Sequence, residues 1–396
     1  MRVFLPFAAG YYAGYVFRAI NALLGPQIAT EFGVGAAQLG FLTSVFFLAI
    51  ALSLIPLGVL LDRYGPRRVD AALLVVAFVG ACIYGSAESV GMLVAGRALI
   101  GVGAAVTLMA SFQAFLLWYP QERIATVNSR AFAVGILGFI TVSMPLEAAL
   151  RVTSWRVAVF AFGLLTLVAA AAIFFAVPER RERPPATRGL GLAVVGMVIA
   201  DAAFLRVVAM ASTGQAALVS LSTLWMATWL RDVSGYDRVA VAEALLVVSI
   251  AMIAGFLFFG RVADAWARRG AAIPPLIATG LGLASACLGL LALGVTTGAL
   301  ALWVAFTFFA SAATLGYSVV SRRFPKELAG RVNTTLNTFV FGAMFLVQWV
   351  FGLILDQWPR SGEGYAPQAY GWALGAVWLA QLAGLTWFWR GRRLIA

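Results

Sequence analysis

The stretch GVLLDRYGPRR, from Gly58 to Arg68, follows a long apolar run and sets one carboxylate among three arginines. A related stretch, GRVADAWARRG, occupies residues 260–270 in the second half of the chain. Self-similarity at a fixed spacing is the sequence signature of a repeated architecture. The charged phrase therefore predicts a protein built from two related halves.

The composition excludes a soluble domain. The 396 residues are 62% hydrophobic and only 11% charged, whereas soluble domains are about 25% charged. Apolar runs of about 20 residues, each long enough to cross a bilayer as a helix, recur along the chain. The N-terminal run contains Arg18 and lacks a small-residue cleavage site, so we interpret it as a span and not as a signal peptide. The sequence predicts an all-α membrane protein.

Hydropathy divides the chain into twelve predicted spans: 4–29, 37–59, 69–88, 89–117, 129–150, 156–177, 206–230, 241–263, 272–293, 298–320, 332–356 and 369–389. With both termini in the cytoplasm, 21 of the 28 Lys and Arg lie on the cytoplasmic side, five lie outside and two lie within spans. This asymmetry satisfies the positive-inside rule. The net charge of +12 is therefore a topology signal for a multi-pass protein of the bacterial inner (plasma) membrane, and does not predict a nucleic-acid partner.

The charged, Pro-rich segment VPERRERPPATRG, residues 177–189, separates six predicted spans from six. Segments of this composition are semi-extended connectors. We therefore predict an N-terminal six-helix bundle at 1–177, a cytoplasmic linker with a surface helix at 178–205, and a C-terminal six-helix bundle at 206–396.

Two offsets relate the halves. An offset of 202 aligns Asp62 with Asp264 and Arg67 with Arg269, and an offset of 205 aligns YPQERIATVNS (119–129) with FPKELAGRVNT (324–334). Both matches fall on the same predicted side of the membrane. The halves are therefore predicted to be parallel repeats, an arrangement in which transporters place their substrate site at the repeat interface.

The pattern Gly58-x3-Asp62-Arg63-x-Gly65-x-Arg67-Arg68 resembles the signature that the major facilitator superfamily (MFS) carries between its second and third helices. The stretch RALIGVGAA, residues 97–105, resembles that family's second signature. The resemblance covers essentially the whole chain. It implies the MFS fold, with twelve transmembrane helices in two pseudo-symmetric six-helix bundles that rock about a central cavity.

The resemblance also implies a cytoplasmic gate, in which Asp62 faces the start of span eleven and Asp264 faces the start of span five. Asn128 and Asn333 stand where those spans are predicted to begin, and Asn is a good N-cap. A carboxylate at a helix N-terminus is favoured by about 0.3–2 kcal/mol. The predicted gate residues are Asp62, Arg63, Arg67, Arg68, Asp264, Arg269, Asn128 and Asn333. The alternative is a charge cluster that serves topology alone.

Glu147 is the only acid that this reading places clearly inside a span, whereas Glu88, Glu243 and Asp356 sit at outer span ends, where solvation explains them. Charged residues inside spans are costly and are functional candidates by default. The resemblance suggests that Arg97 takes part in proton coupling or organises the cavity. We predict that Glu147 couples transport to protons by pairing with Arg97 or Arg18; the alternative is that it only neutralises an arginine.

Tyr11, Tyr15 and Arg18 share one face of the first predicted span, a polar and aromatic face that suits a cavity. The predicted substrate-binding residues are Arg18, Tyr11, Tyr15, Gln113, Gln215, Ser220, Thr223, Trp225 and Asn337. Three alternatives stay open: Arg18 is structural, Trp225 is an interfacial anchor, and the polar side chains join helices.

The chain has no histidine, and each of its two cysteines stands alone in an apolar span, so little catalytic or metal chemistry can be assembled. We predict no enzyme activity, no metal and no cofactor. Two arginines against one glutamate favour a small organic anion. The predicted function is secondary active transport of such an anion or metabolite by alternating access, coupled to protons through Glu147, by a monomer in the lipid bilayer.

Two alternatives belong to other classes. One is proton-driven efflux of drug-like compounds, whose glycine-rich signature in span five is incomplete here: Gly135 and Gly138 are present, but Leu146 and Glu147 follow Pro145. The other is a non-transporting sensor or lipid-moving protein of the same fold.

Overall fold

The structure is a computed structural model that describes residues 2–178, 191–325, 328–360 and 364–395. Helices long and apolar enough to cross a membrane number nine in these ranges, or ten if a bent helix pair counts as one span. The ten correspond to the second through eleventh predicted spans. The first and twelfth are covered by α1 (Phe4–Ala19) with α2 (Asn21–Phe32) and by α18 (Pro367–Arg390). The predicted all-helical membrane architecture is confirmed.

The chain forms two compact units. Unit 1 comprises Met1–Gly33 and Val45–Gly189. Besides α1 and α2, it contains most of α3 (Ala36–Tyr64), then α4 (Pro66–Gly85), α5 (Val90–Ala104), α6 (Thr107–Trp118), α7 (Gln121–Thr141), α8 (Met144–Leu150) and α9 (Trp155–Ala176).

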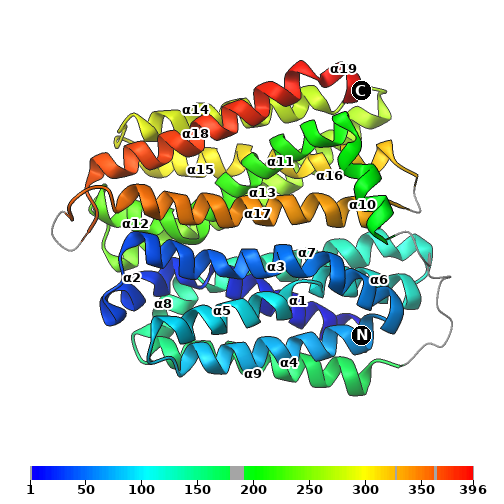
Figure 1. The fold of residues 1–396 in the computed structure, drawn as a ribbon, viewed down its shortest axis with the longest axis horizontal. Helices are drawn as coiled ribbons and strands as arrows, with labels where there is room; N and C mark the ends of the chain where they lie inside the picture. The colour runs from blue at the N-terminus through cyan, green and yellow to red at the C-terminus, as the bar shows by residue number, and fades with distance from the viewer. Residues whose placement is uncertain (1, 179–190, 326–327, 361–363, 396) are drawn as a thin grey trace. The chain divides into compact units, whose positions relative to one another are not determined.

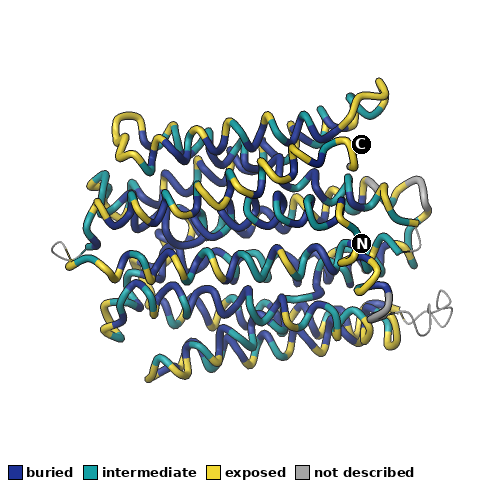
Figure 2. Tube along the Cα trace, turned by 45° about the horizontal axis from the view of Figure 1, so that its top comes forward, coloured by how far each residue is buried: buried dark blue, intermediate teal, exposed yellow. Residues whose placement is uncertain are grey.

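Close packing in unit 1 depends on glycine. Helix α4 packs along α5 and α9, and α1 packs along α7 (Figure 1). A Cβ atom at Gly96 would lie 2.7 Å from the Tyr84 amide nitrogen, and one at Gly103 would lie 2.5 Å from the Ala77 nitrogen. Small residues let helix backbones approach where hydrophobicity alone gives no driving force between helices. Figure 2 shows buried and exposed residues alternating along the helices.

Unit 2 comprises Val34–Ser44 and Leu190–Ala396. It contains α10 (Gly191–Ala200), α11 (Ala202–Ser220), a π-helical turn (Leu221–Trp225), α12 (Met226–Asp232), α13 (Arg238–Arg268), α14 (Pro274–Ala292), α15 (Ala299–Ala310), a 3₁₀ turn (Ser311–Thr314), α16 (Leu315–Arg323), α17 (Ala329–Leu355), α18 and α19 (Arg392–Ile395). Helix α11 packs against α17 and α18, and α14 packs against α15 and α18 (Figure 1). One free cysteine lies in each unit, Cys82 on α4 and Cys287 on α14.

Two helices begin earlier than the sequence predicted. Helix α7 starts at Gln121 after Pro120, and α17 starts at Ala329 after Leu328. Asn128 and Asn333 therefore lie inside their helices, and the prediction that they are N-caps is wrong. The polar turns before each span are themselves helical, so hydropathy marked where the apolar stretch begins and not where the helix begins.

The sequence analysis explained the position of Asp356, at the outer end of a span, by its contact with solvent. This explanation is wrong. Its carboxylate accepts hydrogen bonds from the backbone amides of Ala36 at 2.9 Å and Ala37 at 2.8 Å, at the start of α3. Arg360 donates to the Val34 carbonyl beside it at 3.2 Å. All these residues belong to unit 2. The Asp356 side chain thus caps the N-terminus of a helix that starts 320 residues earlier in the chain.

The proposed division of the chain at 178–205 stays a prediction. Residues 179–190 lie outside the described ranges, and α10 occupies residues 191–200 of the predicted linker.

Candidate functional site

Helix α1 presents tyrosines and an arginine along one face. The Tyr11 hydroxyl donates to the Tyr15 hydroxyl at 3.0 Å, and the Arg18 guanidinium carbon lies 4.8 Å from the centre of the Tyr15 ring. Helix α1 ends at Ala19, one residue after Arg18, and α2 begins at Asn21. Three of the predicted substrate-binding residues therefore lie together on α1, with Arg18 next to the junction between α1 and α2.

Glycines on α7 make room for these rings. A Cβ atom at Gly135 would collide with the Tyr11 ring, and one at Gly138 would lie 2.7 Å from Tyr15 Cβ and 2.9 Å from the Tyr12 carbonyl oxygen. Phe132 and Phe139 of the same helix meet the two tyrosines edge to face. The two glycines that we compared with a drug-exporter signature thus allow the aromatic face of α1 to pack closely against α7.

Arg97 holds the end of α1 to α5. Its side chain is fully buried, and one guanidinium nitrogen donates to the Phe17 carbonyl at 2.7 Å. The guanidinium carbon lies 5.0 Å from the Phe46 ring centre and 5.8 Å from that of Tyr84. A buried cation over two aromatic faces is stabilised by their quadrupoles, which makes Arg97 an organising residue beside Arg18.

Glu147 lies in α8, beyond a 44° bend that separates this short helix from α7. Its side chain is only 3% exposed. A carboxylate oxygen lies 3.8 Å from the side-chain nitrogen of Arg151, one helical turn further on. The predicted pairing of Glu147 with Arg97 or Arg18 stays a prediction.

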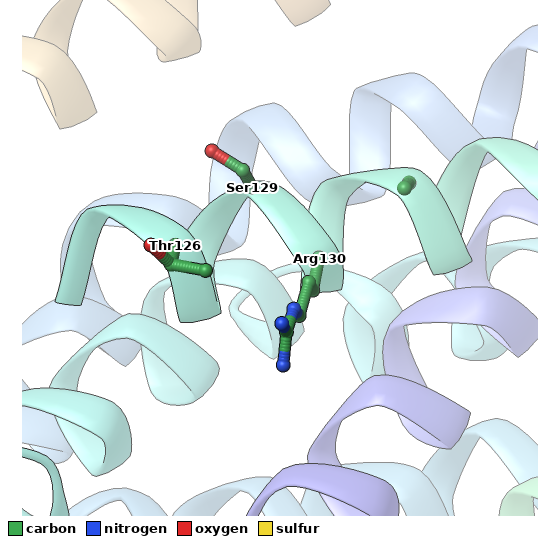
Figure 3. Close-up of a pocket in the computed structure, with 4 residues that line it drawn as sticks. Thr126, Ser129 and Arg130 are labelled. Atoms are coloured by element: carbon green, nitrogen blue, oxygen red, sulfur yellow. The ribbon is translucent and has the colours of Figure 1, made fainter. Parts of the chain in front are cut away.

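A groove of about 430 Å³ runs along one face of α7 and is lined by Thr126, Ser129, Arg130 and Ala133. Figure 3 shows the Arg130 side chain extending from the helix beside the two hydroxyl-bearing residues. Thr126 precedes Ser129 by three residues and Arg130 by four, so it neighbours both on the helix surface, whereas the Ser129 and Arg130 side chains point to different sides of the helix (Figure 3). The sequence analysis counted Arg130 as a topology charge and did not predict this groove.

Three of the predicted gate residues of unit 1, Asp62, Arg63 and Arg67, make contacts inside that unit. The Gln113 amide donates to the Asp62 carboxylate at 3.1 Å, which joins a predicted substrate residue to a predicted gate residue. Arg67 donates from Nε to the Phe174 carbonyl at 2.9 Å, and the Arg63 guanidinium carbon lies 5.2 Å from the Tyr64 ring centre. Arg68 is exposed.

In unit 2, Asp264 and Arg269 are exposed, and Asn333 accepts a hydrogen bond from the Ser321 hydroxyl at 3.1 Å. The predicted contacts of Asp62 with the start of span eleven and of Asp264 with the start of span five stay predictions.

Polar side chains of span seven bond to backbone within unit 2. The Ser220 hydroxyl donates to the Met344 carbonyl at 3.0 Å, and the Thr223 hydroxyl donates to the Val219 carbonyl at 2.8 Å. The fully buried Trp225 indole donates to the Gln348 carbonyl at 3.0 Å. Gln215 is also buried, and Asn337 accepts from the Tyr317 hydroxyl.

One buried acid was overlooked. Asp70 lies in the second turn of α4 and is fully buried. The sequence analysis placed Asp70 at the very start of the third predicted span, 69–88, and did not count it among the acids inside spans. Among the described residues, no group of three or more His, Cys, Asp or Glu could hold a metal ion.

An ion pair joins Glu31, just beyond the first predicted span, to Arg156 at the start of α9 and of the sixth predicted span. Glu31 accepts from Arg156 and, at 2.8 Å, from the Trp155 indole nitrogen. The hydrogen bond from Arg156 lowers the pKa of Glu31 below its usual value, aided by Trp155 and against a smaller effect of partial burial. The pair is half-exposed, so its contribution to stability is small.

Comparisons with known proteins agree with this architecture. Residues 7–348 match the family model described as Major Facilitator Superfamily. The chain is 30% identical over 164 residues to the "Probable sulfoacetate transporter SauU" of Cupriavidus necator, a match that covers 40% of this chain and 36% of that protein. It is 26% identical over 415 residues to the "D-galactonate transporter" of Escherichia coli O6:H1, covering 93% of this chain and 89% of that one.

The matches to the first relatives span about a third of their length. A crystal structure of nucleoside transporter NupG superposes with a TM-score of 0.75 at 14% identity, covering 98% of this chain and 99% of that one. At this identity the likeness concerns the fold alone. With the family model matched over most of its length, the chain belongs to the Major Facilitator Superfamily of transporters and is a multi-pass membrane protein.

Proposed function

We propose that the protein is a secondary active carrier of a small organic anion and that Arg18, Tyr11 and Tyr15 bind this anion. The observation that carries the proposal is the Arg18 guanidinium, which lies over the Tyr15 ring at the break between α1 and α2. A guanidinium offers up to five N–H donors in a planar fork that suits a carboxylate or sulfonate. The phenols of Tyr11 and Tyr15 add hydroxyl groups on the same face.

The balance of charge supports an anion over a cation. Helices α1, α5 and α7 bring Arg18, Arg97 and Arg130, whereas the buried Glu147 has Arg151 beside it. The relatives named for sulfoacetate and D-galactonate carry anionic substrates by name. The same two anions are therefore the first ligands to try.

Coupling to protons through Glu147 is part of the proposal. A buried carboxylate close to arginines can exchange a proton as its surroundings change. Glu147→Gln should abolish uptake driven by a pH gradient and spare exchange of labelled anion across liposome membranes. Unchanged pH dependence in this variant would remove Glu147 from the mechanism.

The proposal includes location and assembly. The protein acts as a monomer in the bacterial inner membrane with both termini in the cytoplasm, an orientation that the positive-inside rule supports. Accessibility of single cysteines placed at the two termini, measured in intact cells and in inverted vesicles, tests this orientation.

The test of the substrate class is the melting temperature of the purified protein with sulfoacetate, D-galactonate, uridine or tetraphenylphosphonium. A ligand that binds the folded state raises apparent stability by mass action. The two anions should raise the melting temperature, and Arg18→Ala should weaken their binding by roughly 10–100-fold, as for a lost hydrogen bond to a charged group of about 1.5–3 kcal/mol.

Arg18→Lys keeps the charge and should retain part of the affinity. Ser220→Ala, at the position that corresponds to Arg18 in the second repeat, is the matched control. Because the Ser220 hydroxyl donates to the Met344 carbonyl, the variant should bind the anions as the wild type does, against the prediction from sequence that Ser220 binds substrate. A shift with tetraphenylphosphonium alone would instead favour export of drug-like cations.

A further inference from the structure

A buried acid, Asp70, lies near the start of α4. The residue is fully buried, and neither carboxylate oxygen has a hydrogen-bond partner among the described residues. Leu73 and Leu74, three and four residues further along α4, belong with Phe7 to an apolar cluster. An ionised carboxylate in such surroundings is costly, and the group takes up a proton instead.

Charged groups on the packed helices lie far from Asp70. Helix α4 packs along α5, α6 and α9. The titratable residue of α5 is Arg97, that of α9 is Arg156, and α6 has none. Arg97 lies over Tyr84, fourteen residues or about 21 Å along α4 from Asp70. Arg156 donates to Ala87, further still.

Helix α1 brings no closer charge. It meets α4 where Gly10 faces Leu74, and the Tyr84 hydroxyl donates to Asn21 beyond the other end of α1. The two helices therefore run in the same direction, and Arg18 lies toward the Tyr84 end. Tyr11 and Tyr15 also lie beyond Gly10 in that direction. On α7, Arg123 and Arg130 are exposed.

At the start of α4, Asp62 and Arg63 at the end of α3, Arg2 before α1 and Arg68 on α4 are all exposed. The partner that we consider for the buried carboxyl group is Arg67, on the same helix. Arg67 precedes Asp70 by three residues, a spacing at which side chains of opposite charge meet on a helix surface. In the present conformation Arg67 donates to the Phe174 carbonyl near the end of α9. The turn at Gly65 and Pro66, where α4 begins, is only about 6 Å along the helix from Asp70.

From this geometry we propose that Asp70 is a proton-binding site of the carrier, distinct from Glu147. Asp70 is protonated in the present conformation, and it releases the proton when Arg67 leaves Phe174 to pair with the carboxylate. The O–H bond of the carboxylic acid breaks, the proton passes to water at the turn, and the carboxylate gains the guanidinium as its counter-ion. The role of this proton in transport rests on the proposed function, whereas its binding does not.

Infrared titration of the purified full-length protein tests the site directly. The carbonyl stretch of a protonated carboxylic acid should be present at neutral pH in the wild type and in Glu147→Gln, and absent in Asp70→Asn. The band should decline as the pH rises. In Arg67→Gln it should persist to higher pH, because the ionised carboxylate has lost its counter-ion.

Three results would overturn the proposal. If the wild type lacks the carbonyl band of a protonated Asp70, the residue is ionised. A band that persists at every pH at which the protein stays folded belongs to a permanently neutral side chain. An Arg67→Gln variant with the wild-type titration excludes the exchange of partners. Asp70→Asn is nearly isosteric and neutral, so it should fold, and Asp70→Glu should restore a titrating band.

The failure of this proposal and that of the anion carrier can be told apart. Asp70 and Arg18 belong to opposite ends of their helices, so Asp70→Asn should keep the melting-temperature shift given by sulfoacetate or D-galactonate. If neither anion shifts the wild type while the infrared band titrates, the proton site stands and the substrate class is wrong. If the anions bind and no band is found, the substrate class stands alone.

Discussion

The first helices of the two repeats, α1 and α11, treat their polar side chains in opposite ways. On α1, Tyr11, Tyr15 and Arg18 contact one another through hydroxyls and an aromatic ring. On α11 and the π-helical turn after it, Ser220 and Trp225 donate to backbone carbonyls of α17. The residue that corresponds to Arg18 in the second repeat is Ser220, a small buried hydroxyl.

This contrast distinguishes side chains on α1 that can bind a substrate from side chains on α11 that stabilise the fold. A side chain that already donates to a buried carbonyl has little left for a ligand, and removing it leaves an unpaired acceptor. Side chains that contact other side chains can exchange those partners for a substrate. Substitutions in the α11 region should therefore reduce stability, whereas substitutions along α1 should reduce binding.

The largest expected effect is on stability, at Trp225. Trp225→Ala should lower the free energy of unfolding by about 3–5 kcal/mol, because it removes a fully buried indole that stacks on Phe351. Trp225→Phe should lose only the bond to Gln348, about 0.5–1.5 kcal/mol. Thermal unfolding in detergent measures both. If Trp225→Phe kept native stability and lost anion binding, the α11 region would bind the substrate, contrary to the comparison with α1.

Gly138→Ala should disturb the α1 face. The added Cβ would lie 2.7 Å from Tyr15, and overpacking of this kind costs about 1–3 kcal/mol. Sulfoacetate binding should weaken in parallel, because Tyr15 shifts under Arg18. The matched control is Gly342→Ala on α17, where nothing lies within 4 Å of the added atom and a small gain of about 0.5–1 kcal/mol is expected. Equal effects at both glycines would remove the special role of the α1–α7 contact.

Removing the Asp356 cap at the start of α3 should lower stability by less than the substitutions above. Asp356→Ala should cost about 0.5–2 kcal/mol, the usual range for a lost N-cap, since two amides lose their acceptor. Asp356→Asn keeps one acceptor oxygen and should cost less. Glu243→Ala, an exposed acid near the start of α13, should change stability by less than about 0.5 kcal/mol. Identical melting temperatures for the Asp356 and Glu243 variants would rule out the cap.

The smallest effect concerns pH. Because the pKa of Glu31 is lowered in the folded state, its ion pair adds stability above the unfolded-state pKa of about 4.3 and loses it as the pH falls through the folded value. Wild type and Glu31→Gln should differ by about 0–1 kcal/mol at pH 7 and converge as the pH falls through the lowered folded-state pKa of Glu31. Melting curves across this range measure the gap. A gap that widens on acidification would contradict the assignment.

The repeat, the family and the approximate spans could be read from the sequence, because apolar run length and the phrases at Asp62 and Asp264 report them directly. The break after Ala19 could not, since Arg18 sits in an apolar stretch that hydropathy reads as continuous. Asp70 was missed because sequence gives depth along a helix but not the face that packing buries. The partner of Asp356 lies 320 residues away, beyond any local pattern.

The two free cysteines, one on α4 and one on α14, give the molecule a natural pair of attachment points. Each lies in a different compact unit, and both are partly exposed. Spin labels on Cys82 and Cys287 would report the separation of the units by pulsed electron resonance without a single engineered residue. Distance distributions recorded with and without anion, at two pH values, would then follow the transport cycle in the native sequence.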